Sequence, residues 1–296
     1  MDCFFINRTQ HLTKYPSKNK LKIKFKYLVF ATFETKIDMR ILIYCFSFLF
    51  FSSAVFANED WGKNGHRAVA QIAESYLSNK ARDQIEKLLE GESMATASTF
   101  ADEIKSDSRY DEFNTWHYVN VDFDATYQTA NKNPAGDLLQ GIKTCLKQLE
   151  ATTTSANDKT FYLKMLIHLI ADMHQPLHLG LEEDRGANDI KVTWFGNSTN
   201  LHRVWDTNMI ESYNMSFTEL AHHKYPLTED EINIYQEGNL MDWFDETRIL
   251  TQEVYLSAQD GDALGYAYSY QWLPRLRKQL HKAGIRLAQM LNELYG

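Results

Sequence analysis

Two histidine–aspartate pairs lie in strongly apolar stretches of the chain. His168 and Asp172 belong to the run from Leu166 to Met173, and His202 and Asp206 flank an apolar Val-Trp dipeptide. A spacing of four residues places both members of a pair on one face of a helix. Buried imidazoles and carboxylates without partners cost several kcal/mol each, and coordination of a metal ion removes that cost. Two such pairs therefore favour a helical fold built around metal ions over solvated ion pairs on helix surfaces.

The composition favours long helices and excludes a turn-rich all-β fold. The 296 residues include only 13 Gly and 5 Pro, and 44% of them are hydrophobic, which is enough for a substantial core. No repeat, low-complexity tract or linker interrupts the chain after residue 60. We therefore expect a single, mainly α-helical domain.

Apolar residues recur at helical spacing in several segments. The spacing runs from Gly65 to Gly91, and further helices are predicted at Asp137–Leu149, Phe161–Met173, Leu201–Tyr213, Glu237–Ser257 and Leu273–Tyr295. Ser98 and Thr99 offer an N-cap for a segment that contains residues 100–105. Residues 190–195 predict a short β-strand of a small hairpin, and the segment around His117 has strand character.

The first sixty residues differ from the rest of the chain. Residues 1–38 are rich in lysine, whereas Met39 and Arg40 precede an apolar run at 41–51 and a small-residue stretch at 52–57. A short basic start, an apolar core and a Val-x-Ala end are typical of a secretory signal peptide. We therefore interpret 39–57 as a signal peptide, 58–296 as the exported domain, and 1–38 as an over-extended start or a disordered basic leader. A genuine basic tail that binds membrane or nucleic acid is the alternative.

Export would change both the charge and the cysteine content. Without residues 1–60 the chain carries 22 Lys and Arg against 34 Asp and Glu, a net charge of −12. A protein that binds a polyanion normally presents a basic face, so either nucleic acid is not the substrate or bound cations supply the positive charge. Cys145 is the one cysteine left, which excludes an intrachain disulfide and a cysteine-based zinc site. Any metal must be held by His, Asp or Glu.

Five segments, in order along the chain, resemble the zinc-dependent single-strand nucleases, the family of the fungal S-one and P-one nucleases and the plant bifunctional nucleases. They are WGKNGH (61–66), FADEIK (100–105), WHYVN (116–120), HLIADMHQPLH (168–178) and NLHRVWD (200–206). The resemblance implies a mainly α, single helical domain of the zinc phospholipase C and single-strand nuclease type with a small β-hairpin. Eukaryotic members carry disulfides and this exported domain cannot, so we interpret the chain as a bacterial member.

In that family three zinc ions line a cleft, and the matching positions imply their ligands. By resemblance, one ion is held by Asp102, His117, His168 and Asp172, a second by His178, His202 and Asp206, and the third by His66, the bridging Asp172 and the N-terminal amine and carbonyl of Trp61. Cleavage after Ala57 would leave three residues ahead of Trp61. The third ion would then require further trimming or a different set of ligands.

Three further positions match residues that contact substrate in the family. Lys105 resembles the lysine that contacts phosphate, and with Asp102 and Asp172 it is an expected catalytic residue. Tyr118 stands where the family stacks a base against an aromatic ring. Asn120 stands where fungal and plant members place an Asp that bonds the base, and its amide can both donate and accept.

The four remaining histidines that follow Asp172 receive other assignments. We expect His174 to support the metal ligands without binding an ion itself. His222, His223 and His281 match no motif and are expected on the surface.

The resemblance implies an endonuclease that hydrolyses single-stranded DNA and RNA to 5′-phosphate products and acts on 3′-nucleotides. Clustered zinc ions would lower the pKa of a shared water toward neutrality for attack on phosphorus, and their charge would offset the acidic domain. The enzyme would be periplasmic or secreted, with no membrane anchor in the mature form and no stable protein partner.

Three alternatives remain open on the sequence alone. A zinc phospholipase C shares the fold and most ligands, but its last pair is usually His-x-x-x-Glu, whereas the last pair here ends in Asp206. A zinc-storing or nucleic-acid-binding protein without turnover would use the same ligands. A helical exported protein with incidental histidines is the third.

Overall fold

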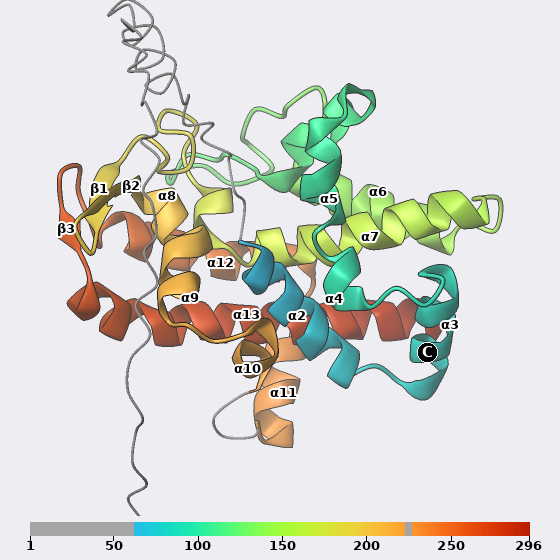
Figure 1. Ribbon diagram of the computed structural model, residues 1–296. Coiled ribbons are helices and arrows are strands. Elements are labelled where there is room, and N and C mark those ends of the chain that lie inside the picture. Colours follow the sequence, from blue (N-terminus) through green and yellow to red (C-terminus); the bar gives the residue numbers. More distant parts are fainter. Residues whose placement is uncertain (1–61, 223–226) are drawn as a thin grey trace, which may run out of the picture. The chain divides into compact units, whose positions relative to one another are not determined.

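The computed structural model describes residues 62–222 and 227–296. The predicted signal peptide, the leader before it, Trp61 and His223 therefore lie outside the described residues. The described chain is mainly α-helical with one small sheet, as the sequence predicts (Figure 1).

Most helices follow one another along the chain with short connections, but residues 118–137 contain no helix or strand. The α-helices are α2 (Lys63–Ser75), α3 (Asn79–Leu88), α4 (Met94–Ala97), α5 (Phe100–Glu103), α6 (Leu138–Glu150), α7 (Ala156–Met173), α8 (Leu201–Arg203), α9 (Met209–Ser212), α10 (Phe217–Ala221), α11 (Glu229–Gln236), α12 (Leu240–Tyr255) and α13 (Tyr266–Tyr295). Three 3₁₀ segments, η1 (Ile104–Ser106), η2 (Ser108–His117) and η3 (Pro176–Leu179), and one π-helical segment, η4 (Val204–Asn208), complete the helical structure.

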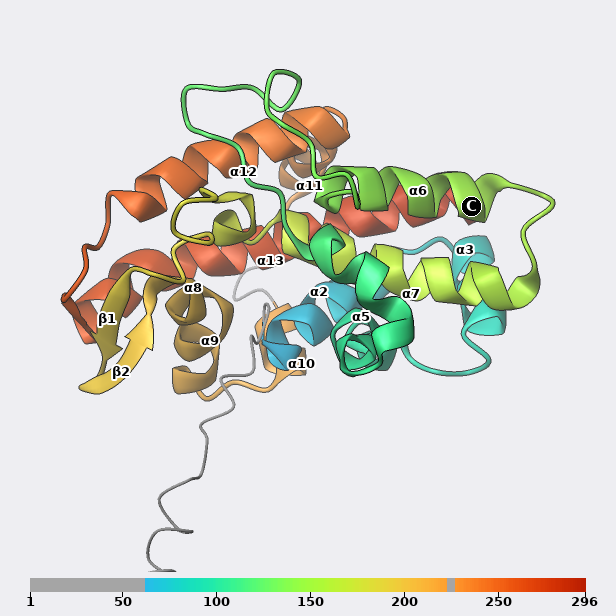
Figure 2. The same cartoon turned by 90° about the horizontal axis from the view of Figure 1, so that it is seen from above.

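The long C-terminal helix α13 lies along the centre of the molecule, with α2 and α7 on one side and α12 on another (Figures 1 and 2). Its residues from Leu280 to Ala288 are almost entirely buried. At the crossing with α2, a Cβ built on Gly284 would lie 2.6 Å from Cβ of Ile72 and 2.9 Å from the carbonyl oxygen of Val69. The two backbones can approach this closely because glycine has no side chain.

A small sheet contains the predicted hairpin. Strand β1 (Lys191–Trp194) pairs antiparallel with β2 (Asn197–Asn200), in a register that places Trp194 opposite Asn197. Phe195 and Gly196 form the two-residue turn, both at positive φ, as tight hairpins require. A third strand, β3 (Ala263–Leu264), pairs parallel to β1. It was not predicted, because two residues carry no detectable alternation.

The helical spacing from Gly65 to Gly91 belongs to two helices rather than one. The chain leaves α2 at Tyr76, and α3 begins after Ser78, whose side chain accepts a hydrogen bond from the Ala81 amide. Asn292 of α13 bonds the break from both sides, accepting from the Ser78 amide (2.8 Å) and donating to the Tyr76 carbonyl (3.0 Å). This contact joins residues more than two hundred positions apart, so local periodicity could not reveal it.

The strand character assigned to the segment around His117 was wrong. Residues 108–117 form the 3₁₀ segment η2, which Asp107 caps by accepting from the Arg109 amide. The extended backbone starts only at Tyr118, where the amides of Val119 and Val121 donate to the carbonyls of His178 and Gly180. The backbone of this segment therefore pairs with the end of η3 and the residue after it, and not with a strand.

Helix α13 begins seven residues before the predicted start at Leu273 and passes through Pro274. Proline disfavours a helix around it, but Tyr268, Trp272 and Leu273 are buried and hold the first turns against the core. Among residues 62–222 and 227–296, no helix has both the length and the apolar character needed to cross a bilayer.

The crossing of α2 and α13 makes a testable prediction. Gly284→Ala should lower the free energy of unfolding by about 1–3 kcal/mol, because the new methyl group overlaps Ile72 and the two helices must move apart. Urea denaturation followed by far-ultraviolet circular dichroism measures this change. An unchanged denaturation midpoint would show that the helices do not approach as closely as described.

Candidate metal centre and active site

The predicted ligands, apart from Trp61, come from seven elements, which are α2, α5, η2, α7, η3, α8 and η4. Helix α7 carries His168 and Asp172, and α8 with the following η4 carries His202 and Asp206. The ligand atoms form three groups, each with atoms within 4.8 Å of one another. The groups are His66, His168 and Asp172; Asp102, His117 and His168; and His178, His202 and Asp206.

Asp172 stands at the centre of these groups. Its carboxylate is fully buried, and each oxygen faces two imidazoles. Oδ1 lies 3.4 Å from His66 and 3.3 Å from His178. Oδ2 lies 3.1 Å from both His117 and His168. One carboxylate therefore connects four rings, the arrangement expected of a bridging ligand.

The orientation of His168 is set by a carbonyl outside the group. Its Nδ1–H donates to the Ser98 carbonyl at 2.7 Å, so in the neutral ring Nε2 carries a lone pair. That nitrogen faces Asp172 at 3.1 Å and Asp102 at 3.6 Å. A lone pair aimed at two carboxylates is unfavourable unless a cation lies between them, and a carbonyl fixing the other nitrogen is typical of metal-bound histidine.

His202 repeats this arrangement in the third group. Its Nδ1–H donates to the Gly186 carbonyl at 2.6 Å, and Nε2 faces Oδ2 of Asp206 at 2.9 Å. Gly186 has a φ of 63°, and a Cβ there would lie 2.4 Å from the Leu177 carbonyl oxygen, so only glycine fits. Asp206 lies in η4, the π-helical segment after α8. Such widened turns often occur at functional sites.

His66, on the first turns of α2, joins the centre by stacking. Its ring lies parallel to that of His168, with centroids 3.8 Å apart and an interplanar angle of 10°. The neighbouring Gly62 donates its amide to the Asp206 carbonyl at 2.7 Å. This bond holds the start of α2, and the residue that follows Trp61, against the segment that carries the third group.

The buried charges shift each other's pKa values strongly. Burial raises the pKa of Asp102, and the nearby Asp172 and Asp206 raise it further. Burial and then Lys105 lower the pKa of His117 to about 3. For His178, burial alone would lower the pKa, but the Asp172 and Asp206 carboxylates outweigh it and raise the pKa to about 10. Perturbed groups clustered in a cleft are typical of functional sites.

The donor set fits divalent metal ions. Ligand atoms about 2.0–2.2 Å from a tetrahedral zinc lie about 3.3–3.6 Å apart, and the donor pairs here are 2.9–3.8 Å apart. Within the described chain, both ring nitrogens of His178 and Oδ1 of Asp172 are buried without a hydrogen bond. Imidazole and carboxylate without thiolate is a combination that zinc accepts.

An open cleft of about 640 Å³ lies over the centre, and the predicted substrate contacts line it. Its lining includes His117, His178 and His202 on the floor and Lys105, Tyr118 and Asn120 on the wall. Lys105 donates to Asp102 at 3.0 Å, and burial lowers its pKa to about 8 against the opposing effect of Asp172 and Asp206. Tyr118 is 41% exposed, so its ring is available to a ligand.

The sequence analysis missed residues that hold the ligands in place. Gln175 is fully buried, its amide donates to Asp206, and its carbonyl oxygen accepts from the Leu177 amide at 2.6 Å. Its position between two motif histidines was the available signal. The Gly186 and Ser98 carbonyls carried none, because backbone acceptors do not depend on residue type.

The other histidines divide as follows. His174 donates to the Ile170 carbonyl (2.8 Å) and accepts from Arg286 (3.0 Å), so no metal ligand contacts its ring nitrogens directly. His222 is exposed, as predicted. The surface assignment of His281 was wrong: only 3% of it is exposed, because it lies on the buried middle of α13.

Imidazoles and carboxylates that converge under an open cleft, on a mainly helical scaffold, define a class of protein: helical hydrolases whose reaction centre is built to hold several cations. The family model described as S1/P1 Nuclease matches residues 61–296, and the chain belongs to this family. It is therefore an enzyme, a phosphodiesterase that acts on the ester bonds of nucleic acid.

Named relatives from plants and fungi cover most of the same region. Endonuclease 4 of Arabidopsis thaliana is 31% identical over 267 residues, which cover 79% of this chain and 89% of that protein. Nuclease P1 of Penicillium citrinum is 26% identical over 276 residues, covering 80% of this chain and 98% of that protein. Nuclease S1 of Aspergillus oryzae is 30% identical over 164 residues, covering 51% of this chain and 55% of that protein.

The bond between Gly186 and His202 predicts the effect of one methyl group. Gly186→Ala should lower kcat for nucleic acid hydrolysis by about 10–100-fold, because the methyl group meets the Leu177 carbonyl and displaces the acceptor that orients His202. Gly196→Ala is the matched control, since Gly196 also has a positive φ of 82° but nothing within 4 Å of an added Cβ. Equal losses in the two variants would mean that backbone strain, not the orientation of His202, is responsible.

Proposed function

We propose that this protein is an exported, zinc-dependent endonuclease that hydrolyses single-stranded RNA and DNA to products with 5′-phosphate ends, and that it also acts on 3′-nucleotides. The observation that carries the proposal is the Asp172 carboxylate bridging four buried imidazoles under the cleft. The relatives named endonuclease and nuclease support the reaction. The signal peptide expected at residues 39–57 supports export.

The proposed zinc ligands are those the three groups offer. Asp102, His117, His168 and Asp172 would hold one ion, and His178, His202 and Asp206 a second. His66 and Asp172 would hold the third, together with the amine and carbonyl of Trp61. The bond from the Gly62 amide to the Asp206 carbonyl supports this, because it joins the residue after Trp61 to the segment of the third group. When bound, zinc supplies Lewis-acid charge beside the phosphate and acidifies nearby water.

The residues of this chain bind and orient the substrate. Lys105, on the cleft wall and bonded to Asp102, places a cation where a phosphate oxygen would lie. The exposed ring of Tyr118 can stack on a base, a contact worth about 1–3 kcal/mol that tolerates any sequence. Asn120, beside it in the cleft, can donate to or accept from a base edge.

The stacking contact supports a preference for single strands. In a duplex the faces of a base are covered by its neighbours, whereas a single strand can turn a base onto an aromatic ring. A stack on Tyr118 therefore requires an unpaired nucleotide while the adjacent phosphate lies over the His and Asp groups. Duplex ends and paired regions would reach the cleft only after local melting.

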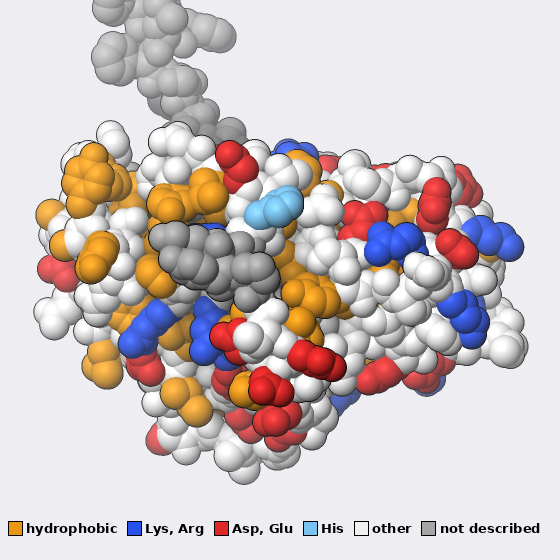
Figure 3. All heavy atoms as spheres, turned by 90° about the horizontal axis from the view of Figure 1, so that it is seen from below, with side chains coloured by type: hydrophobic (Ala, Val, Ile, Leu, Met, Phe, Trp, Pro, Cys, Tyr) orange, Lys and Arg blue, Asp and Glu red, His pale blue; other side chains and the backbone are white. Residues whose placement is uncertain are grey.

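Bound cations would also resolve the charge balance. On the face shown in Figure 3, Lys and Arg side chains of the described residues are mixed with Asp and Glu and form no continuous basic surface. A net charge of −12 after residue 60 repels a polyanion. Three zinc ions would add six positive charges at the centre, and the attraction for phosphate would then be confined to the cleft.

Removal of metal tests the proposed cofactor. Dialysis against EDTA should abolish hydrolysis of single-stranded RNA and DNA, and added zinc should restore it, because the donor groups require a cation. Metal analysis of the exported protein, together with its intact mass, should give about three zinc ions per chain that begins at Trp61. Full hydrolysis by the metal-free protein would contradict zinc dependence, and about two ions with Asn58 at the start would remove the third site.

The bridging role of Asp172 predicts that an Asp-to-Asn change at this position lowers catalytic activity strongly. Asp172→Asn should lower kcat more than about a hundredfold, since the amide presents only one oxygen to the four rings. Asp158→Asn, on the exposed first turn of the same helix, is the matched control and should keep full activity. Far-ultraviolet circular dichroism should show the helices intact in both. Near-normal turnover by Asp172→Asn would refute the bridging role.

A further inference from the structure

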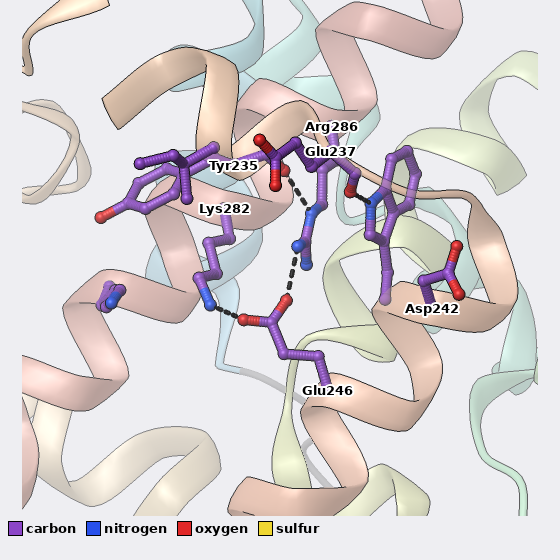
Figure 4. A pocket seen from close by; sticks show the side chains of 9 residues that line it. Tyr235, Glu237, Asp242, Glu246, Lys282 and Arg286 are labelled. Atoms are coloured by element: carbon purple, nitrogen blue, oxygen red, sulfur yellow. Dashed lines mark hydrogen bonds and ion pairs between the residues drawn. The ribbon is translucent and has the colours of Figure 1, made fainter. Parts of the chain in front are cut away.

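We infer that Arg286 is a positioning residue for the metal centre. From α13 it bonds His174 in the turn that follows α7, and by fixing this turn it positions the ligands before and after it, Asp172 and His178. The inference rests on the metal binding proposed above. It concerns a cluster of charged residues between α11, α12 and α13, around a small pocket of about 330 Å³ (Figure 4).

Arg286 comes from α13, and 4% of its side chain is exposed. Nε donates to the Tyr235 carbonyl at 2.7 Å, Nη2 donates to Glu246 on α12, and Nη1 donates to Nε2 of His174 at 3.0 Å. Its guanidinium also lies 5.0 Å from the centre of the Trp243 ring. A planar group with every nitrogen engaged in a different direction is held in one position.

His174 receives this bond in a defined orientation. Its Nδ1–H donates to the Ile170 carbonyl on its own helix at 2.8 Å, so Nε2 is the acceptor that faces Arg286. The ring is fully buried, and His174 is the C-cap residue of α7, where its backbone amide donates to the Ala171 and Asp172 carbonyls. Since Asp172 lies two residues before it, the rotation of the last turn of α7 depends on where this ring is held.

Two further hydrogen bonds, from α12 and α13, hold the same turn. Gln279 of α13 donates to the His174 carbonyl at 3.0 Å, and Thr251 of α12 donates to the Pro176 carbonyl at 2.7 Å. On the opposite side of the turn, Gln175 donates to the metal ligand Asp206. Helices α12 and α13 thus bond residues 174 and 176, and the Gln175 side chain between them bonds the proposed ligand Asp206.

Stability alone is a poor reason for this cluster. The Glu246 side chain is 39% exposed, and an ion pair with so exposed a partner contributes little to stability, because solvent screens the attraction. Lys282 lies one turn before Arg286 and also pairs with Glu246. Within residues 62–222 and 227–296 it makes no hydrogen bond to residues 174–176. It therefore separates the two roles, since both cations pair with Glu246 but only Arg286 of the two bonds His174.

The rate of zinc release to a chromogenic chelator tests the inference. Arg286→Met should release zinc about 10–100-fold faster than the unchanged protein, whereas Lys282→Met, the matched control, should release it at the unchanged rate. Arg286→Lys keeps the charge beside Glu246 but cannot reach the three partners together, so it should behave as Arg286→Met does. Ile285→Val, the buried neighbour on α13, controls for general loss of stability.

The outcomes are decisive in each direction. Unchanged release from a folded Arg286→Met, or equal acceleration in Lys282→Met or Ile285→Val, overturns the inference. If Arg286→Met does not fold, Thr251→Val replaces it as the test. This variant keeps the shape of the side chain, removes the bond to the Pro176 carbonyl and should also accelerate zinc release. Unchanged release would overturn the inference. An unchanged protein that binds no zinc would instead refute the proposed function.

Discussion

The buried carboxylate of Asp172 must be surrounded by groups that compensate its charge, and this need constrains how the helices of the protein come together. It faces His66 and His178 through one oxygen and His117 and His168 through the other. Burial alone would raise its pKa, but the surrounding imidazoles outweigh that effect and hold the pKa well below its usual range. A charge removed from water is tolerated only where opposite charge or a cation faces it. This requirement brings three regions that are distant in the sequence to one point: α2, η2 and the stretch from α7 to η3.

The helices meet this requirement by packing closely against one another. The central helix α13 approaches α2 at Gly284 and reaches the end of α7 through Arg286 and Gln279. Carbonyls of Ser98 and Gly186 fix the outer nitrogens of the two best-oriented histidines. Ser98 lies in the turn between α4 and α5, and Gly186 lies in a turn before β1. Each carbonyl holds one ring nitrogen so that the other faces a carboxylate, which reduces the ordering that binding of an ion would require.

The cleft combines features that act on different parts of a nucleic acid. Its floor presents the imidazoles of His117, His178 and His202, and its wall presents the Lys105 ammonium, the Tyr118 ring and the Asn120 amide. The floor would attract phosphate only when cations occupy it, since the protein itself is acidic. Affinity and reaction would therefore depend on the same bound ions, and an enzyme without them would neither hold nor cut its substrate.

The two His–Asp pairs of the candidate site could be recognised from the sequence alone. Helical spacing and apolar neighbours placed His168 with Asp172, and His202 with Asp206, on buried helix faces, because a period of 3.6 residues leaves little choice of side. The sequence also predicted the hairpin at β1 and β2 and the mainly helical fold. It did not reveal β3, the break between α2 and α3, or the 3₁₀ segment before His117. The 3₁₀ segment is capped locally by Asp107. The third strand, the helix break and the contacts of Gln175 and Arg286 became visible only in the folded protein, because they join residues far apart in the chain, and local pattern carries no information about such contacts.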